Sequence, residues 1–280
     1  MDFFKDRSLF IASMHGKEQA IAPLLEKELG VNCFTIEGFN TDCYGTFSGE
    51  IEREGSPLET IRKKCIAGMN LAQSELGIAT EGSFGPHPFL FGVPAHEEIL
   101  ILIDQKNNIE ITAKSLVTET NFLGREIPNV QALMEFMVEV KFPSHGIILK
   151  DKATHFLEAF KNARSNDELF AQFHACQQKY GSVYAETDMR AMYNPTRMSV
   201  IKRVCQKLIE KVKNTCPLCL TPGFDVVERI PGLPCSFCKM PTDSIVTERF
   251  ACQACQHSLQ KTRGDGKAFE DPMYCSVCNP

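Results

Sequence analysis

Four Cys-x-x-Cys pairs near the C-terminus constrain the fold of this chain more than any other feature. They are Cys216/Cys219, Cys235/Cys238, Cys252/Cys255 and Cys275/Cys278. Two thiolates three positions apart bind one zinc ion at about 2.3 Å, and a second pair completes a tetrahedron. The gaps of about 13 to 19 residues between successive pairs are typical of zinc ribbons. The eight thiolates therefore predict two structural zinc sites with no position open for water.

The spacing leaves open which pairs share a zinc ion. Sequential pairing joins the first two pairs and the last two. Nested pairing joins the outer pairs around a central ribbon made by Cys235/Cys238 and Cys252/Cys255, and we favour this arrangement slightly. Residues 225–230 and 243–250 have the composition of strands that lead from one pair to the next. Disulfides are the less favoured alternative, because regular Cys-x-x-Cys pairs in a cytosolic chain indicate metal binding.

The composition indicates a globular protein and argues against a membrane protein or a non-specific nucleic-acid-binding protein. The chain has 280 residues, 43% of them hydrophobic, and 20 Phe, which suits one large domain or two smaller ones with a real core. The sequence has no apolar run of transmembrane length and no pattern of a signal peptide, so we expect a cytoplasmic protein with reduced cysteines. The net charge of −5 argues against non-specific coating of nucleic acid.

Strand and helix patterns alternate in the first part of the chain. Ser8–Ala12 is a predicted strand, and a helix follows it. Ser56-Pro-Leu-Glu59 is a capping box that opens a second helix. Leu76–Ala79 is a predicted strand that ends in a loop over residues 80–88, and a hairpin turns at Asn107-Asn108. The alternation predicts an α/β fold, with a mixed sheet between flanking helices.

Further elements continue this pattern up to the cysteines. A helix is expected from Pro128 to Val140, a second helix opens at the capping box Ser165-Asn-Asp-Glu168, and a third starts at Asn194-Pro195. Because the last helix leads directly into the Cys pairs, we expect an α/β domain over residues 1–213. A double zinc-ribbon domain is then expected over residues 214–280.

The turn Ser13-Met-His-Gly-Lys17 is the first candidate site. It joins a strand to the start of a helix, where backbone N–H groups and the helix dipole attract anions. Gly16 allows close approach of the backbone, and Lys17 adds positive charge. We therefore assign phosphate binding to Ser13, His15 and Gly16, and a catalytic role to Lys17. An ordinary turn with a solvated lysine is the alternative.

The second candidate is Glu81, in the segment Glu81-Gly-Ser-Phe-Gly-Pro-His87. We expect this segment to be a loop beyond the end of a strand, where open α/β sheets bind their ligands. The carboxylate can bind Mg²⁺ or act as a base. Parallel strands place their carboxyl ends together, so Glu81 and Lys17 are expected at the same edge of the sheet.

Charged residues also gather around the start of the last helix. The segment Glu186-Thr-Asp-Met-Arg190 makes Arg190 a candidate ligand-binding residue, with a salt-bridged helix cap as the alternative. The helix itself carries six basic residues: Arg197, Lys202, Arg203, Lys207, Lys211 and Lys213. Such a face is either solvated or, beside zinc ribbons, able to contact RNA or DNA.

Three segments together resemble a known enzyme family. They are Ile11-Ala-Ser-Met-His-Gly-Lys17, Ser56-Pro-Leu-Glu59 with Lys63 and Lys64, and Gly77-Ile-Ala-Thr-Glu-Gly82. Over residues 1–120 the chain is similar to the house-cleaning pyrophosphatases that act on inosine and xanthosine triphosphates, although His15 stands where that family has Asn. The whole chain more closely resembles a bacterial family, a domain of unknown function, that shares the Glu-Gly-Ser-Phe-Gly-Pro-His and Glu-Thr-Asp-Met-Arg motifs and the Cys-rich tail.

Two functions follow from these patterns. The first is a Mg²⁺-dependent hydrolase of a phosphorylated small molecule, such as a nucleoside triphosphate. Lys17 would hold phosphate, Glu81 would hold the metal, and Lys63 or Lys64 would neutralise developing charge. The second is a non-enzymatic binding module, in which the zinc ribbons and the basic helix contact protein or nucleic acid.

Overall fold

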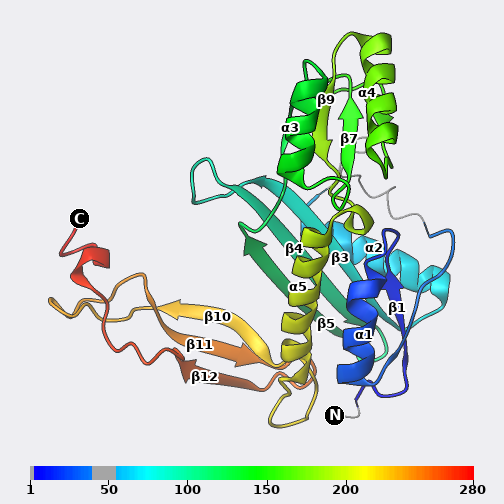
Figure 1. Ribbon diagram of the computed structural model, residues 1–280. Helices are drawn as coiled ribbons and strands as arrows, with labels where there is room; N and C mark the ends of the chain where they lie inside the picture. Colours follow the sequence, from blue (N-terminus) through cyan, green and yellow to red (C-terminus); the bar gives the residue numbers. More distant parts are fainter. Residues whose placement is uncertain (1–2, 40–54) are drawn as a thin grey trace.

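The computed structural model describes residues 3–39 and 55–280, which form three units (Figure 1). An α/β body contains the N-terminal elements and the last long helix. A smaller unit with its own sheet and helices is inserted before that helix, and the Cys-rich tail follows it. None of the helices in the described ranges has the length and apolar character needed to span a membrane.

The body is built on a five-stranded mixed sheet with the order β2-β1-β3-β4-β5. Its strands are β1 (Ser8–Ala12), β2 (Asn32–Phe34), β3 (Leu76–Pro86), β4 (Pro94–Asp104) and β5 (Ile109–Val117). Strand β1 runs parallel to both of its neighbours, whereas β3, β4 and β5 are antiparallel to one another. The predicted mixed sheet is therefore confirmed.

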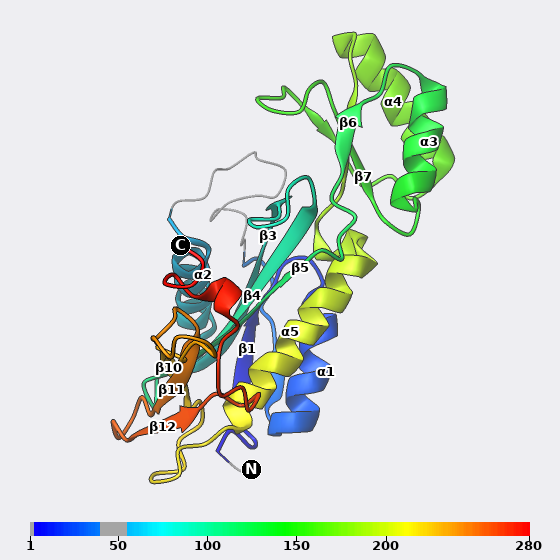
Figure 2. The ribbon, with the colours of Figure 1, turned by 90° about the vertical axis from the view of Figure 1, so that its left-hand side faces the viewer.

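Helices cover both faces of this sheet (Figure 2). Helices α1 (Glu18–Leu29) and α5 (Pro195–Lys213) lie on one face, and α2 (Pro57–Ala72) lies on the other. The side chains of β3 alternate between the two cores, with Ile78 packed on the α1/α5 side and Ala79 on the α2 side. The predicted arrangement of flanking helices is thus confirmed as well.

The inserted unit has a separate sheet and a separate core. Its elements are β6 (Gly124–Glu126), α3 (Val130–Val140), β7 (Ile147–Lys150), β8 (Ala159–Phe160), α4 (Asn166–Tyr180) and β9 (Tyr184–Thr187). The strands form an antiparallel sheet in the order β6-β9-β7-β8, and both helices pack on one of its faces (Figure 2). A short 3₁₀ helix, η2 (Ala191–Tyr193), leads from this unit back to α5.

Strand β3 is longer than predicted, and this changes the setting of Glu81. The expected strand ended at Ala79, but β3 pairs with β4 as far as Pro86, and Glu81 lies opposite Ile99. The polar residues after Ala79 remain extended because β4 provides a partner along their full length. Strand β1 ends at Ala12, opposite Ala79. The part of β3 that carries Glu81 therefore lies beside the turn that follows β1, and it is not a loop.

Candidate functional site

The tail brings its eight cysteines together in two groups of four. One group is Cys216, Cys219, Cys252 and Cys255, and the other is Cys235, Cys238, Cys275 and Cys278; within each group the sulfur atoms lie within 4.8 Å of one another. Between cysteines of different pairs, four of the sulfur–sulfur distances are 3.5 to 3.8 Å. Four sulfurs held tetrahedrally at about 2.3 Å from zinc would be separated by about 3.8 Å. Each group therefore fits one zinc ion with four thiolate ligands.

The pairing is interleaved, so the favoured nested arrangement is wrong, and the sequential one is too. The first Cys pair joins the third, and the second joins the fourth. The cause is an antiparallel meander of three strands, β10 (Asp225–Pro231), β11 (Ile245–Ala251) and β12 (Ser258–Thr262). A strand of seven residues such as β10 spans roughly 23 Å. Each strand carries the chain to the opposite end of the sheet, so alternate pairs meet.

The first three Cys pairs share one backbone turn. In each, the N–H of the first cysteine donates to a carbonyl five residues later, from Cys216 to Thr221, from Cys235 to Met240 and from Cys252 to His257, at 2.9 Å in all three. Backbone N–H groups also point at the sulfurs, as Leu218 N does toward Cys216 Sγ at 3.4 Å. These N–H groups stabilise negative charge on the thiolates. The turns thus prepare the sulfurs for a metal ion.

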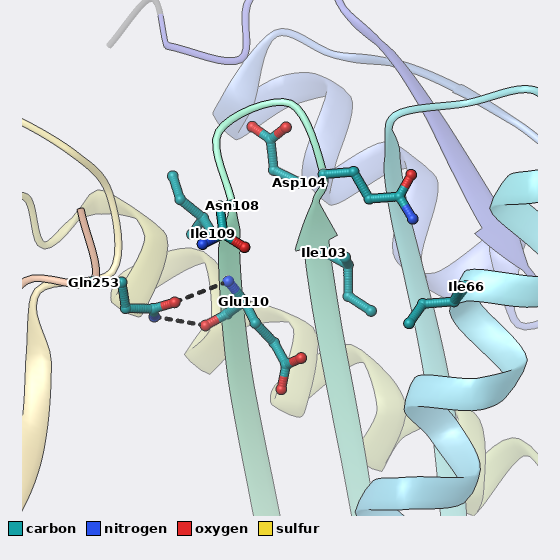
Figure 3. A pocket seen from close by; sticks show the side chains of 8 residues that line it. Ile66, Ile103, Asp104, Asn108, Ile109, Glu110 and Gln253 are labelled. Carbon is teal, nitrogen blue, oxygen red and sulfur yellow. Dashed lines mark hydrogen bonds between the residues drawn. The ribbon is translucent and has the colours of Figure 1, made fainter.

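The first zinc group is attached to the edge of the body's sheet. Gln253 lies between the cysteines of the third pair, and its amide bonds to the backbone of Glu110 on β5 (Figure 3). A groove lies beside this contact, between the turn of the third Cys pair, the β4–β5 hairpin and α2. Ile66 and Ile103 line its wall. Gly223 of the tail also packs against Ile111 of β5. The turn of the third Cys pair therefore contacts the body as well as forming part of the tail.

Three of the predicted site residues meet inside the body, where β1 ends. Lys17 is 6% exposed, and its Nζ donates to the carbonyl of Thr80 at 3.0 Å. Lys64 of α2 reaches Glu81 of β3, with 2.5 Å between Nζ and Oε2, and both side chains are buried. The three residues come from the start of α1, from α2 and from β3. The structure thus places two lysines and a carboxylate in one buried cluster.

The cluster continues on the other face of the sheet around Glu98, which the sequence analysis missed. The Glu98 carboxylate is fully buried and accepts hydrogen bonds from Thr80 Oγ1, His96 Nε2 and Arg197 Nε, the last two at 2.8 and 3.1 Å. Arg197 also donates to the carbonyl of Met189 at 2.7 Å, which ties α5 to the end of the inserted unit.

The electrostatics of the cluster are set by burial and by the nearby charges. Burial, together with the neighbouring Arg197, lowers the pKa of Lys17 to about 7. Burial alone would raise the pKa of the Glu98 carboxyl, but Arg197 and the hydrogen bond from His96 hold this pKa well below its usual range. Glu98 is therefore charged at neutral pH, whereas Lys17 changes its charge there.

The turn that precedes Lys17 makes mostly internal contacts. The Ser13 hydroxyl donates to the Glu18 carboxylate at 2.7 Å and accepts from the backbone N–H of Lys17 at 3.2 Å. Gly16 has a positive φ of 74° and lies against Met192 of η2, while His15 is 9% exposed. A carboxylate thus occupies the start of α1, where the sequence analysis expected a phosphate.

Arg190 and the basic helix are also engaged within the chain. Arg190 forms an ion pair with Asp188 at 2.6 Å and donates to Asn162 at 2.9 Å. Five of the six basic side chains of α5 make contacts: Arg197 with Glu98, Arg203 with Glu119, Lys207 with Ser115, Lys211 with Asp225 and Lys213 with Glu28. The basic face is therefore partly neutralised, and a nucleic-acid partner stays a prediction.

Comparison with known families places most of the chain in a described family. A family model described as a domain of unknown function (DUF6671) matches residues 64–280, a range that contains Lys64, Glu81 and all eight zinc-ligand candidates but not Lys17. No curated protein matches the chain. The resemblance to a family with a Cys-rich tail is thereby supported, whereas the resemblance to the house-cleaning pyrophosphatases gains no support.

Proposed function

The chain belongs to the family described as a domain of unknown function (DUF6671), and we propose that its α/β body binds a phosphorylated small molecule beside Lys17, Lys64 and Glu81. A nucleotide bound together with Mg²⁺ is the form we favour. One observation carries the proposal, namely the convergence of two buried lysine side chains and a carboxylate from three separate elements. Such a group is costly to bury, and a lysine whose pKa is strongly shifted, as that of Lys17 is, is typical of functional sites.

The charge balance of the cluster suits an anion. Lys17 has a pKa of about 7, so its charged form lies close in energy to its neutral form. A phosphate beside it would favour the charged form and raise the pKa. Binding would then be coupled to proton uptake, because a neutral Lys17 must gain a proton to pair with the phosphate.

Glu81 is the residue that would bind a metal ion. Within residues 3–39 and 55–280, groups of three or more metal-ligating side chains occur only in the tail, so Mg²⁺ at Glu81 would rely on phosphate and water for its other ligands. That is the usual coordination of Mg²⁺ in phosphate-transfer sites. Glu81 would hold the metal, and Lys64, its ion-pair partner in this structure, would bind the phosphate. The lysines would then stabilise the charge that grows as a phosphoanhydride breaks.

The two Cys groups act as structural zinc sites in this account. Four thiolates fill the coordination sphere, so the metal has no position for water or substrate. Their role is to fold the tail and to hold Gln253 against β5.

A binding role of the tail is the second candidate. It is favoured by exposed apolar side chains around the second zinc group, including Phe237 at 79% exposure and Tyr274 at 64%. Most basic side chains of α5 make internal contacts and are therefore less available to the phosphates of a nucleic acid. A protein is the partner that better suits the exposed apolar side chains of the tail.

The experiment is a screen of nucleoside triphosphates, including the inosine and xanthosine forms, with Mg²⁺ or Mn²⁺. Release of phosphate or pyrophosphate and shifts of the melting temperature are measured on the full chain. We expect at least one nucleotide to be cleaved, and Lys17→Ala and Glu81→Gln to lower the rate by on the order of 10²-fold. If no nucleotide is cleaved and none shifts the melting temperature, the proposal fails and the binding role of the tail takes its place.

A further inference from the structure

The two groups of cysteines differ in their exposure to solvent. In the first group Cys219 and Cys255 are exposed, and the other two cysteines are buried. In the second group Cys238 and Cys278 are only half-buried, and the other two are buried, so none of its four cysteines is exposed. A small oxidant dissolved in water therefore reaches the first group more readily than the second.

The more exposed half of the first group also has a second sulfur close by. Cys219 Sγ lies 3.5 Å from Cys252 Sγ, and Cys255 Sγ lies 3.7 Å from Cys216 Sγ. Cysteines that bind zinc do so as thiolates, and the thiolate is the form that oxidants attack. An accessible thiolate beside a second cysteine is typical of redox-sensitive sites. Of the two exposed cysteines, Cys219 has the nearer partner.

We propose that Cys219 is an oxidation site for hydrogen peroxide, and that its oxidation releases zinc from the first group. The Cys219 thiolate attacks one peroxide oxygen, the O–O bond breaks, and the leaving hydroxide takes a proton to become water. The Cys252 thiolate then attacks the sulfur of the resulting sulfenic acid. A disulfide forms, and the second hydroxide also leaves as water. In total, two thiolates, one peroxide and two protons give one disulfide and two water molecules.

The disulfide removes two of the four ligands of the first group. Cys216 and Cys255 alone cannot complete a tetrahedral site, so the metal ion is lost. Thiol–disulfide exchange with a reductant restores the two thiolates, and zinc can then bind again. The oxidation is therefore reversible.

This change reaches the body through Gln253, which follows Cys252 directly in the chain. The disulfide draws the Cys219 and Cys252 sulfurs from 3.5 Å to about 2 Å and frees Cys255, so the turn that carries Gln253 has to shift. Its hydrogen bonds to the backbone of Glu110 are then weakened (Figure 3). The second group lies at the outer end of the tail (Figure 1), away from this contact. The inference does not depend on phosphate binding by the body.

The test treats the zinc-loaded full chain with hydrogen peroxide and follows zinc release with a chromogenic chelator. We expect one of the two zinc ions to leave about ten times faster than the other. Differential alkylation and peptide mass spectrometry should identify Cys219–Cys252 as the first disulfide. Dithiothreitol with added zinc should restore the metal content. Hydrogen exchange should become faster at the Glu110 N–H after oxidation, because this group donates to Gln253.

Two matched variants assign the fast release to one group. Histidine binds zinc but forms no disulfide, so Cys219→His and Cys238→His should both still hold two ions. Cys219→His should abolish the fast release, whereas Cys238→His changes the equivalent position of the second group and should leave it intact.

Three results would overturn the inference. They are equal release of both ions, earlier oxidation of the second group, and a first disulfide that lacks Cys219, such as Cys216–Cys255. The peptide map of wild type decides among them even where a variant loses its zinc. Zinc release that leaves exchange at Glu110 unchanged would contradict the effect on the body.

Discussion

The side-chain amide of Gln253 pairs with the backbone of Glu110 as a neighbouring strand would. Its Oε1 accepts from Glu110 N at 3.0 Å, and its Nε2 donates to Glu110 O at 2.7 Å (Figure 3). The Glu110 carboxylate in turn accepts from Arg62 of α2, with 2.7 Å between Nε and Oε2. One residue of a zinc knuckle thus continues the hydrogen bonding of β5 at its edge.

Replacing Gln253 tests how much this contact stabilises the junction. Gln253→Ala removes two hydrogen bonds at the sheet edge, and we expect it to lower the free energy of unfolding by about 1 kcal/mol. Urea denaturation of the full chain measures the change. Gln260→Ala, which removes an exposed amide from β12, is the control and should have almost no effect. An equal loss in both variants would mean that the Gln253 contact contributes nothing specific.

Zinc content after paired cysteine replacements tests the interleaved pairing. Purified wild type should hold two zinc ions per chain, and Cys216→Ser or Cys252→Ser alone should release one. Because these two cysteines share a site, the double variant Cys216→Ser/Cys252→Ser should still hold one ion. Cys216→Ser/Cys235→Ser should hold none. Sequential pairing would leave one ion in this second double variant, and elemental analysis distinguishes the two results.

The buried pair of Glu98 and Arg197 should be important for folding. Either Glu98→Gln or Arg197→Met leaves a buried charge without its partner, which costs about 3 to 5 kcal/mol. The double variant should lose less than the sum of the two single losses, since no isolated charge remains. Arg203→Gln breaks an exposed ion pair with Glu119 and should change stability by less than about 1 kcal/mol. Chemical denaturation that ranks the variants otherwise would contradict this assignment.

Lys17 should make stability depend on pH in a defined direction. Its folded pKa of about 7 lies below the ordinary 10.5, so between these values the unfolded chain binds more protons and stability rises with pH. The slope that Lys17 contributes is at most about 1.4 kcal/mol per pH unit, and it vanishes below pH 7. The difference in unfolding free energy between wild type and Lys17→Met, measured from pH 7 to 9, should shift in favour of wild type. A difference that does not vary with pH would show that Lys17 is charged in the folded state.

Sequence reasoning identified the eight cysteines that the structure gathers into two groups, but not their pairing. Cys-x-x-Cys spacing specifies a knuckle locally, and the segments 225–230 and 243–250 were recognisable as strands. The pairing depends on a third strand, Ser258–Thr262, whose five residues are all exposed and show no alternation. Recognition of all three strands would have predicted that successive Cys pairs lie at opposite ends of the sheet, so that alternate pairs share a site.

Only the part of the candidate site that follows from the direction of the strands could be predicted from the sequence. Parallel strands with adjacent carboxyl ends predicted that Lys17 and Glu81 lie close together, and the structure places them so. Glu98 was missed because its partner Arg197 lies 99 residues away, and no local pattern joins them. The inserted unit was missed because the helix and strand patterns do not reveal which sheet a strand joins.

Binding of a nucleoside triphosphate to paired lysine variants tests the central claim most directly. Lys64 is buried against Glu81, whereas Lys63 beside it on α2 is exposed. Isothermal titration calorimetry with Mg²⁺ and the best nucleotide from the screen should show at least tenfold weaker binding for Lys64→Ala and unchanged binding for Lys63→Ala. Equal affinities in wild type and both variants would contradict the claim that this cluster holds phosphate.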